Sequence, residues 1–203
     1  LFSHPGASFG GIIYRNLSFD DCWKIIELIE KAALENKLDN IFIIQPPNIF
    51  SKYQNNEIVD YCLRRKKYTS SENYLTSVLN VEEKTNEQIK KISKNKKRSE
   101  RYYNNLIAKN KLRFKWVDNF DVFYPILIKN KNKHNAIPTH SHKELERLRS
   151  LFPQDILQLM LYCDVPIGGM TIFKANQKSI IIFYSMFDYA YNKMQPITLL
   201  MQF

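Results

Sequence analysis

The sequence KTNEQIKKISKNKKRSERYYNNLIAKNKLRFK, residues 84–115, decides how the rest of the chain is arranged. It contains 12 lysines and arginines and only two carboxylates, Glu87 and Glu100, which gives it a net charge of +10. The whole chain of 203 residues also carries +10, so the remainder is neutral. The stretch has no proline or glycine, and its apolar side chains recur at roughly helical intervals, which predicts a long amphipathic helix. These side chains are Ile89, Ile92, Tyr102, Tyr103, Leu106 and Ile107.

Three interpretations of this basic helix stay open: a solvated surface helix, the wall of a site for an anionic ligand, or an arm that binds nucleic acid. Arg98 and Arg101 are suited to grip a phosphate or a carboxylate in a bidentate way. Tyr102 and Tyr103 beside them are suited to stack on a ring or a sugar. The alternative for the tyrosines is burial in a seam between two domains. The ligand hypothesis requires the cations to face a cleft rather than open solvent.

The composition is that of an ordinary globular protein, with 44% hydrophobic and 25% charged residues. No apolar run approaches the roughly 20 residues of a membrane-spanning helix, and no signal peptide is visible. We therefore expect a cytoplasmic protein without a membrane span. Because the chain starts at Leu1 without a methionine and stops at Phe203 within an apolar run, we also expect it to be a piece of a longer protein.

The three cysteines, Cys22, Cys62 and Cys163, are odd in number and widely spaced, with no CxxC pair. This pattern is typical of buried, reduced thiols and not of a disulfide framework or a zinc site. We expect each of them to be a small core residue.

The first half of the chain shows a pattern of short strands and helices. Ser18 and Asp21 have the spacing of a capping box at the start of a helix. The apolar patterns then predict a helix over 18–36, a strand over 41–44, a helix over 57–67 and a strand over 73–79.

The second half has a similar general plan, with three consecutive strands followed by a helix. A second capping box, Ser141 with Glu144, opens a helix. The predicted elements are a strand over 112–117, a helix over 120–128 kinked or delayed by Pro125, a polar and mobile segment over 130–140, a helix over 141–151, strands over 156–163, 167–174 and 179–187, and a final helix from Pro196.

The predicted fold class is mixed α/β (α+β), in three parts. Residues 1–80 form the end of a first unit, residues 81–110 form the basic connecting helix, and residues 111–203 form the start of a second, truncated unit.

Three segments together resemble a known family: SHPGASFGG at residues 3–11, the basic helix, and IPTHSHKELERLRSLFP at residues 137–153 followed by LYCDVPIGGMTIF. They are similar to the FemAB-like branch of the GNAT (acyl-CoA N-acyltransferase) superfamily. The resemblance implies two GNAT-like units joined by a long basic helix, both incomplete in this chain. It also implies N-acyl or aminoacyl transfer to an amine on an amino sugar, an amino acid or a cell-wall or polysaccharide precursor. The donor would be acyl-CoA or aminoacyl-tRNA, without a metal.

Such a site must align an amine with a carbonyl, stabilise an oxyanion and supply a proton to the leaving group. Tyr184 is the candidate catalytic acid, and a core tyrosine is its alternative. His140 is a candidate contact to the substrate, and His4 either lines a cleft or bonds its own turn. His140 and His142 alternate, but no acidic or cysteine partner is evident, so we expect no metal site.

GNAT proteins usually bind the donor's phosphates at a Gly-rich turn that follows a bulged strand and precedes a helix. Gln195 and Pro196 stand where the family commonly has a small pair such as Gly-Ala. Two alternatives to acyl transfer therefore stay open. One is a non-catalytic protein that keeps the GNAT fold and binds a partner, and the other is RNA binding, including tRNA, through the basic helix. The expected acceptor is a small molecule, peptide or sugar with anionic groups.

Overall fold

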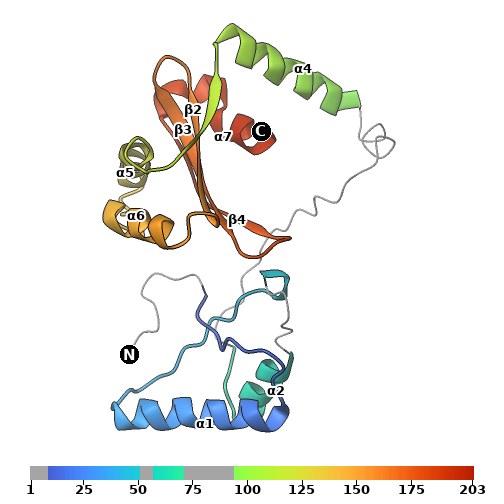
Figure 1. Cartoon of the computed structure of the whole chain (residues 1–203), viewed down its shortest axis with the longest axis vertical. Coiled ribbons are helices and arrows are strands. Elements are labelled where there is room, and N and C mark those ends of the chain that lie inside the picture. The colour runs from blue at the N-terminus through green and yellow to red at the C-terminus, as the bar shows by residue number, and fades with distance from the viewer. Residues whose placement is uncertain (1–8, 51–56, 71–93) are drawn as a thin grey trace. The chain divides into compact units, whose positions relative to one another are not determined.

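The computed structural model describes residues 9–50, 57–70 and 94–203 (Figure 1). The chain forms two compact units, one made of residues 1–76 with 175–179 and the other of residues 77–174 with 180–203. The second unit contains a four-stranded antiparallel sheet with helices on both faces. The predicted mixed α/β class is thus confirmed.

The described residues of the first unit form two α-helices, α1 (Phe19–Glu35) and α2 (Glu57–Arg65), and the short 3-10 helix η1 (Asn48–Phe50). As predicted, Ser18 caps α1: its hydroxyl accepts a hydrogen bond from the Asp21 N–H at 3.1 Å. The two α-helices bury a small core between them. This core consists of Cys22, Ile26, Val59, Cys62 and Leu63.

The strand predicted over 41–44 is wrong, because these residues belong to no strand. The Ile44 carbonyl accepts one hydrogen bond from the Gly10 N–H at 2.8 Å, but no ladder forms around it. Phe42 is 77% exposed, so its apolar side chain does not contribute to a core. The strand predicted over 73–79 lies outside the described residues.

The sheet of the second unit has the strand order β1-β2-β3-β4, with every neighbouring pair antiparallel. The four predicted strands are confirmed to within one residue at each end. Their bounds are β1 (Arg113–Val117), β2 (Ile156–Tyr162), β3 (Pro166–Lys174) and β4 (Ile180–Phe187).

Helices cover both faces of this sheet (Figure 1). On one face lie α5 (Phe123–Lys133) and α6 (His142–Leu151), packed on a core that includes Phe123, Leu127 and Leu145. The other face has its own core, against which α4 (Lys94–Lys109) and α7 (Pro196–Gln202) pack, after the 3-10 helix η2 (Tyr189–Met194). The sheet therefore separates two hydrophobic cores.

Helix α5 starts at Phe123, which fits the predicted delay by Pro125, but it ends later than predicted. Pro125 lies in its first turn, where a missing N–H costs nothing, so it does not kink the helix. The helix continues to Lys133. The prediction of a polar and mobile segment over 130–140 is therefore wrong for its first residues, 130–133. Asn130 is only 4% exposed, because its amide donates hydrogen bonds to the carbonyls of Ile126 and Phe187. One polar side chain thus ties α5 to the end of β4.

Strand β4 contains a bulge. Thr171 of β3 pairs with Tyr184, but the next residue, Ile172, pairs with Ile182, which leaves Phe183 as the extra residue. A bulge bends its strand and changes the direction of the neighbouring side chains, and bulges are common beside active sites. The bulge lies directly next to Tyr184.

Candidate functional site

Two of the predicted site residues meet inside the second unit. The Tyr184 hydroxyl of β4 lies 3.2 Å from Nδ1 of His140, a residue that precedes α6. The backbone N–H of His140 also lies 3.4 Å from the same hydroxyl oxygen. Tyr184 is 3% exposed and His140 is 9% exposed. Both members of this buried polar pair were predicted as site residues from the sequence. Their contact was not predicted.

The position of His140 is fixed by its neighbours. Ser141 and Glu144 form the predicted capping box: the Ser141 N–H donates to the Glu144 carboxylate at 2.7 Å, and the Glu144 N–H donates to the Ser141 hydroxyl at 3.3 Å. The hydroxyl of Tyr124, on α5, donates to the His140 carbonyl at 3.3 Å. Two helices thus hold the histidine beside the bulged strand.

Tyr184 continues a polar row across the sheet. Gln158 of β2 pairs with Thr171 of β3, and Thr171 pairs with Tyr184. The Thr171 hydroxyl donates to the Gln158 side-chain carbonyl at 2.6 Å, and both residues are buried. Because buried polar groups need partners, this row fixes the side chains on the face that α5 and α6 cover.

Burial raises the pKa of the Tyr184 phenol above its ordinary value. Hydrogen bonds from His140 and Thr139 oppose this rise without cancelling it. The hydroxyl therefore keeps its proton at neutral pH. In chemical terms it is suited to donate a proton and not to accept one as a base.

Two contacts of this pair were not predicted. Thr139 is a hydrogen-bond partner of Tyr184 and directly precedes His140 in the chain. Its position next to His140 could have indicated this contact. Tyr124 belongs to a helix whose pattern indicates core packing alone, and nothing in the sequence relates it to residue 140.

The predicted site residues of the basic helix differ in how far they are buried. Tyr103 is half-buried against the core on the α4 and α7 face, and its hydroxyl donates to the Gln195 side-chain carbonyl at 2.9 Å. Arg101 is exposed and Tyr102 is 48% exposed. The side chain of Arg98 and the whole of His4 lie outside the part of the chain whose side chains the structure describes.

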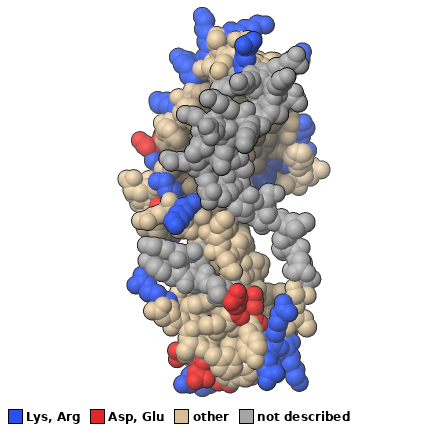
Figure 2. Space-filling view, turned by 90° about the vertical axis from the view of Figure 1, so that its right-hand side faces the viewer, with Lys and Arg blue, Asp and Glu red and all other residues tan. Residues whose placement is uncertain are grey.

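The cations that follow Arg101 in the basic stretch are also exposed. These are Lys109, Lys111, Arg113 and Lys115. In the view of Figure 2, Lys and Arg side chains gather over the second unit with few carboxylates among them, whereas both signs lie side by side over the first unit. The described part of the basic stretch thus presents its cations to solvent, and these residues do not meet the condition that the ligand hypothesis set for them.

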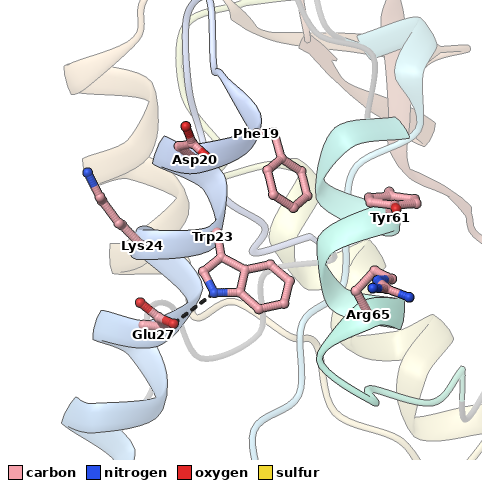
Figure 3. A pocket seen from close by; sticks show the side chains of 7 residues that line it. All are labelled: Phe19, Asp20, Trp23, Lys24, Glu27, Tyr61 and Arg65. Carbon is pink, nitrogen blue, oxygen red and sulfur yellow. Dashed lines mark hydrogen bonds between the residues drawn. The ribbon is translucent and has the colours of Figure 1, made fainter.

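The first unit contains an open groove between α1 and α2 with a volume of about 550 Å³ (Figure 3). Three aromatic rings and four charged side chains line it: Phe19, Tyr61, Trp23, Asp20, Lys24, Glu27 and Arg65. The indole N–H of Trp23 donates to Glu27 at 2.8 Å, and the Lys66 ammonium lies 4.7 Å from the indole centroid. None of the predicted site residues belongs to this groove.

Comparison of the chain with models of protein families, with curated proteins and with solved structures finds no match. Within residues 9–50, 57–70 and 94–203, no helix has the length and apolar character that crossing a bilayer requires.

Proposed function

We propose that this chain is part of a cytoplasmic acyltransferase of the FemAB-like GNAT type, which transfers an acyl or aminoacyl group from acyl-CoA or aminoacyl-tRNA to an amine. Two features support the proposal. The quoted sequence segments resemble this family, and the second unit has a bulged strand, β4, followed by a turn and a helix, which is the order the family uses around its donor.

The observation that carries the proposal is the contact between Tyr184 and His140 next to the bulge. In acyl transfer the amine nitrogen forms a bond to the carbonyl carbon, and the bond from that carbon to the donor's sulfur or oxygen breaks. The leaving group then takes a proton, which the protonated Tyr184 hydroxyl supplies. The proton that the attacking amine loses restores the phenol through His140 Nδ1. A positioned acid of this kind contributes typically about 10²–10⁴-fold to a rate.

Arg101 is the described cation assigned to the anionic part of the donor or acceptor. It is exposed to solvent and does not meet the requirement that the basic stretch face a cleft, so its support for the proposal is limited to the bidentate grip of a guanidinium on a phosphate or a carboxylate. Exposed Tyr102 beside it is available to stack on a ring.

The test is an acyl-transfer assay with the intact chain. Labelled acetyl-CoA and, separately, charged tRNA are mixed with amino sugars, amino acids and short peptides, and transfer of the label is measured. Tyr184→Phe is expected to lower the rate about 10²-fold or more while the protein remains folded. Tyr162→Phe, at a half-buried tyrosine of β2, which β3 separates from β4, is the matched control and is expected to retain the rate.

A second candidate function is a non-catalytic protein that binds a partner through this fold. The specific observation in its favour is that Tyr184 is 3% exposed and that its hydroxyl already has protein partners. In addition, Gln195 adopts a left-handed conformation with φ 48°, and Pro196 offers no N–H at the start of α7. A folded chain that binds a donor or a nucleic acid but never transfers the label would favour this function.

A further inference from the structure

Among the residues that the structure describes, one cluster brings together three potential metal ligands: Asp121, His142 and Glu146. Nε2 of His142 lies 3.1 Å from a carboxylate oxygen of Asp121 and 3.7 Å from one of Glu146. All three ligand atoms lie within 4.8 Å of one another. The cluster belongs to the second unit and contains none of the residues assigned to acyl transfer.

Helix α6 and the loop before α5 hold these atoms in place. His142 and Glu146 are four residues apart on α6 and therefore share one helix face. The Phe120 N–H donates to Glu146 Oε1 at 2.6 Å, and the Arg149 guanidinium donates to the Asp118 carbonyl at 2.8 Å. The loop that carries Asp121 is thus fastened to α6 at two residues that precede Asp121, Asp118 and Phe120.

The imidazole nitrogen at the centre of the cluster, His142 Nε2, is buried without a hydrogen bond to any described residue. His142 Nε2 is shielded from solvent, and no described residue offers it a hydrogen bond of acceptable geometry, although two carboxylate oxygens lie near it. A buried nitrogen without a hydrogen bond costs free energy. A cation placed between the three atoms would satisfy all of them at once.

The distances between the ligand atoms suit a metal ion. Zinc bonds to histidine nitrogen and carboxylate oxygen are about 2.0–2.2 Å long, so the edges of a tetrahedral site are about 3.3–3.6 Å. The two distances from His142 Nε2, 3.1 and 3.7 Å, bracket this range. The Asp121 side chain is 68% exposed and is therefore free to adjust the remaining edge.

We propose that Asp121, His142 and Glu146 bind a Zn²⁺ ion. Three protein ligands leave one position of a tetrahedral site open to water. One nitrogen and two oxygen ligands suit zinc better than magnesium, because imidazole is a poor ligand for hard cations. The ion would link α6 to the loop before α5 and would also neutralise the two carboxylates. The competing arrangement is a protonated His142 that forms an ion pair with the same two carboxylates.

The test is a calorimetric titration of the metal-free intact chain with ZnCl₂. One equivalent is expected to bind, and saturating ZnCl₂ is expected to raise Tm because the ion binds only the folded cluster. Asp121→Asn and His142→Gln are each expected to weaken zinc binding by at least about 100-fold, since even groups that only orient a metal ligand contribute about 10–100-fold. Visible absorption of bound Co²⁺ provides a second, spectroscopic readout.

Two control variants remove the same kinds of side chain elsewhere in the second unit. Asp164→Asn and His134→Gln replace exposed residues and are expected to leave zinc binding unchanged. Circular dichroism of each variant shows whether it is folded. Absence of one-equivalent binding by the folded wild-type chain, or zinc affinity equal in wild type, Asp121→Asn and His142→Gln, would overturn the proposal and leave the ion pair. The acyl-transfer assay is independent of this result, because neither Tyr184 nor His140 is a ligand.

Discussion

The hydroxyl of Tyr184 lies 3.2 Å from Nδ1 of His140, although the two residues are 44 positions apart in the chain. The contact joins the bulged strand β4 to the turn that precedes α6. Both side chains are buried, so the pair contributes to the stability of the second unit as well as to the chemistry proposed for it.

The Tyr184–His140 contact predicts a measurable coupling energy. Tyr184→Phe removes the hydroxyl and is expected to lower the free energy of unfolding by about 0.5–1.5 kcal/mol, the usual net value of one hydrogen bond. His140→Ala is expected to cost more, because it also removes the packing of the imidazole on Phe183. Urea unfolding of both single variants and the double variant measures the coupling. Strictly additive losses would show that the two side chains do not interact.

Gly169 is predicted to tolerate no side chain. A Cβ atom at this position would lie 2.5 Å from Met160 Sδ and 2.7 Å from a ring carbon of Phe123. Gly169→Ala is therefore expected to destabilise the protein by about 1–3 kcal/mol, the typical cost of overpacking a core. The backbone of Gly169 thus packs closely against the side chains of Met160 and Phe123.

Gly168→Ala is the matched control, because the nearest atom to its Cβ would be Phe187 Cβ at 3.1 Å. Urea unfolding is expected to show a smaller loss for Gly168→Ala than for Gly169→Ala. Equal losses would contradict a specific effect of the contact with Met160 and Phe123, because the lower entropy of the unfolded chain favours the folded state in both variants.

The ionised carboxylate of Asp188 is predicted to stabilise the folded protein, and this stabilisation is lost at low pH. Its hydrogen bond from the Lys129 ammonium, at 2.8 Å, lowers the pKa of the carboxyl group in the folded state, and the Ala190 N–H adds to this effect. Because the folded pKa lies below the unfolded value of about 3.9, the stabilisation is complete well above that pH and is lost as pH falls through the folded pKa.

The measurement is the difference in Tm between wild type and Asp188→Asn across pH. It is expected to be constant between about pH 6 and 8 and to shrink below about pH 4. Asp164→Asn, at an exposed aspartate, is expected to show no such change. A Tm difference for Asp188→Asn that persists undiminished in acid would contradict the role of the ion pair.

The three thiols are predicted to react at different rates. Cys22 and Cys62 are buried, whereas Cys163 is partly exposed, which corrects the expectation that all three are buried. Burial and a hydrogen bond with Cys62 raise the pKa of Cys22 to about 12, so almost no reactive thiolate forms at pH 8. A thiol reagent at pH 8 is expected to label one thiol rapidly and two slowly.

Cys163→Ser is expected to abolish the rapid phase, and urea is expected to make all the thiols react rapidly. A rapid phase that survives Cys163→Ser would place a reactive thiol in the first unit, against the structure.

The second unit was largely predictable from the sequence, because its strands are apolar runs separated by turn residues and α6 opens with a capping box. The bounds of α5 were not, because a proline in a first turn and a proline in a helix interior look alike in a sequence. The strand predicted at 41–44 failed because an apolar run shows that a segment packs on a core, as Ile43 does, but not that its backbone pairs with another strand. The acidic neighbours of His142 were not predicted, because Asp121 belongs to a separate loop. The four-residue spacing of His142 and Glu146 was the one available signal.

The most direct measurement of the proposed function is hydrogen–deuterium exchange of the intact chain with acetyl-CoA and, separately, with charged tRNA. Binding of a donor beside Tyr184 predicts slower exchange in residues 137–142 and 180–187 with at least one of the two donors. Unchanged exchange in both segments with acetyl-CoA and also with charged tRNA, each at a saturating concentration, would contradict an acyltransferase site there.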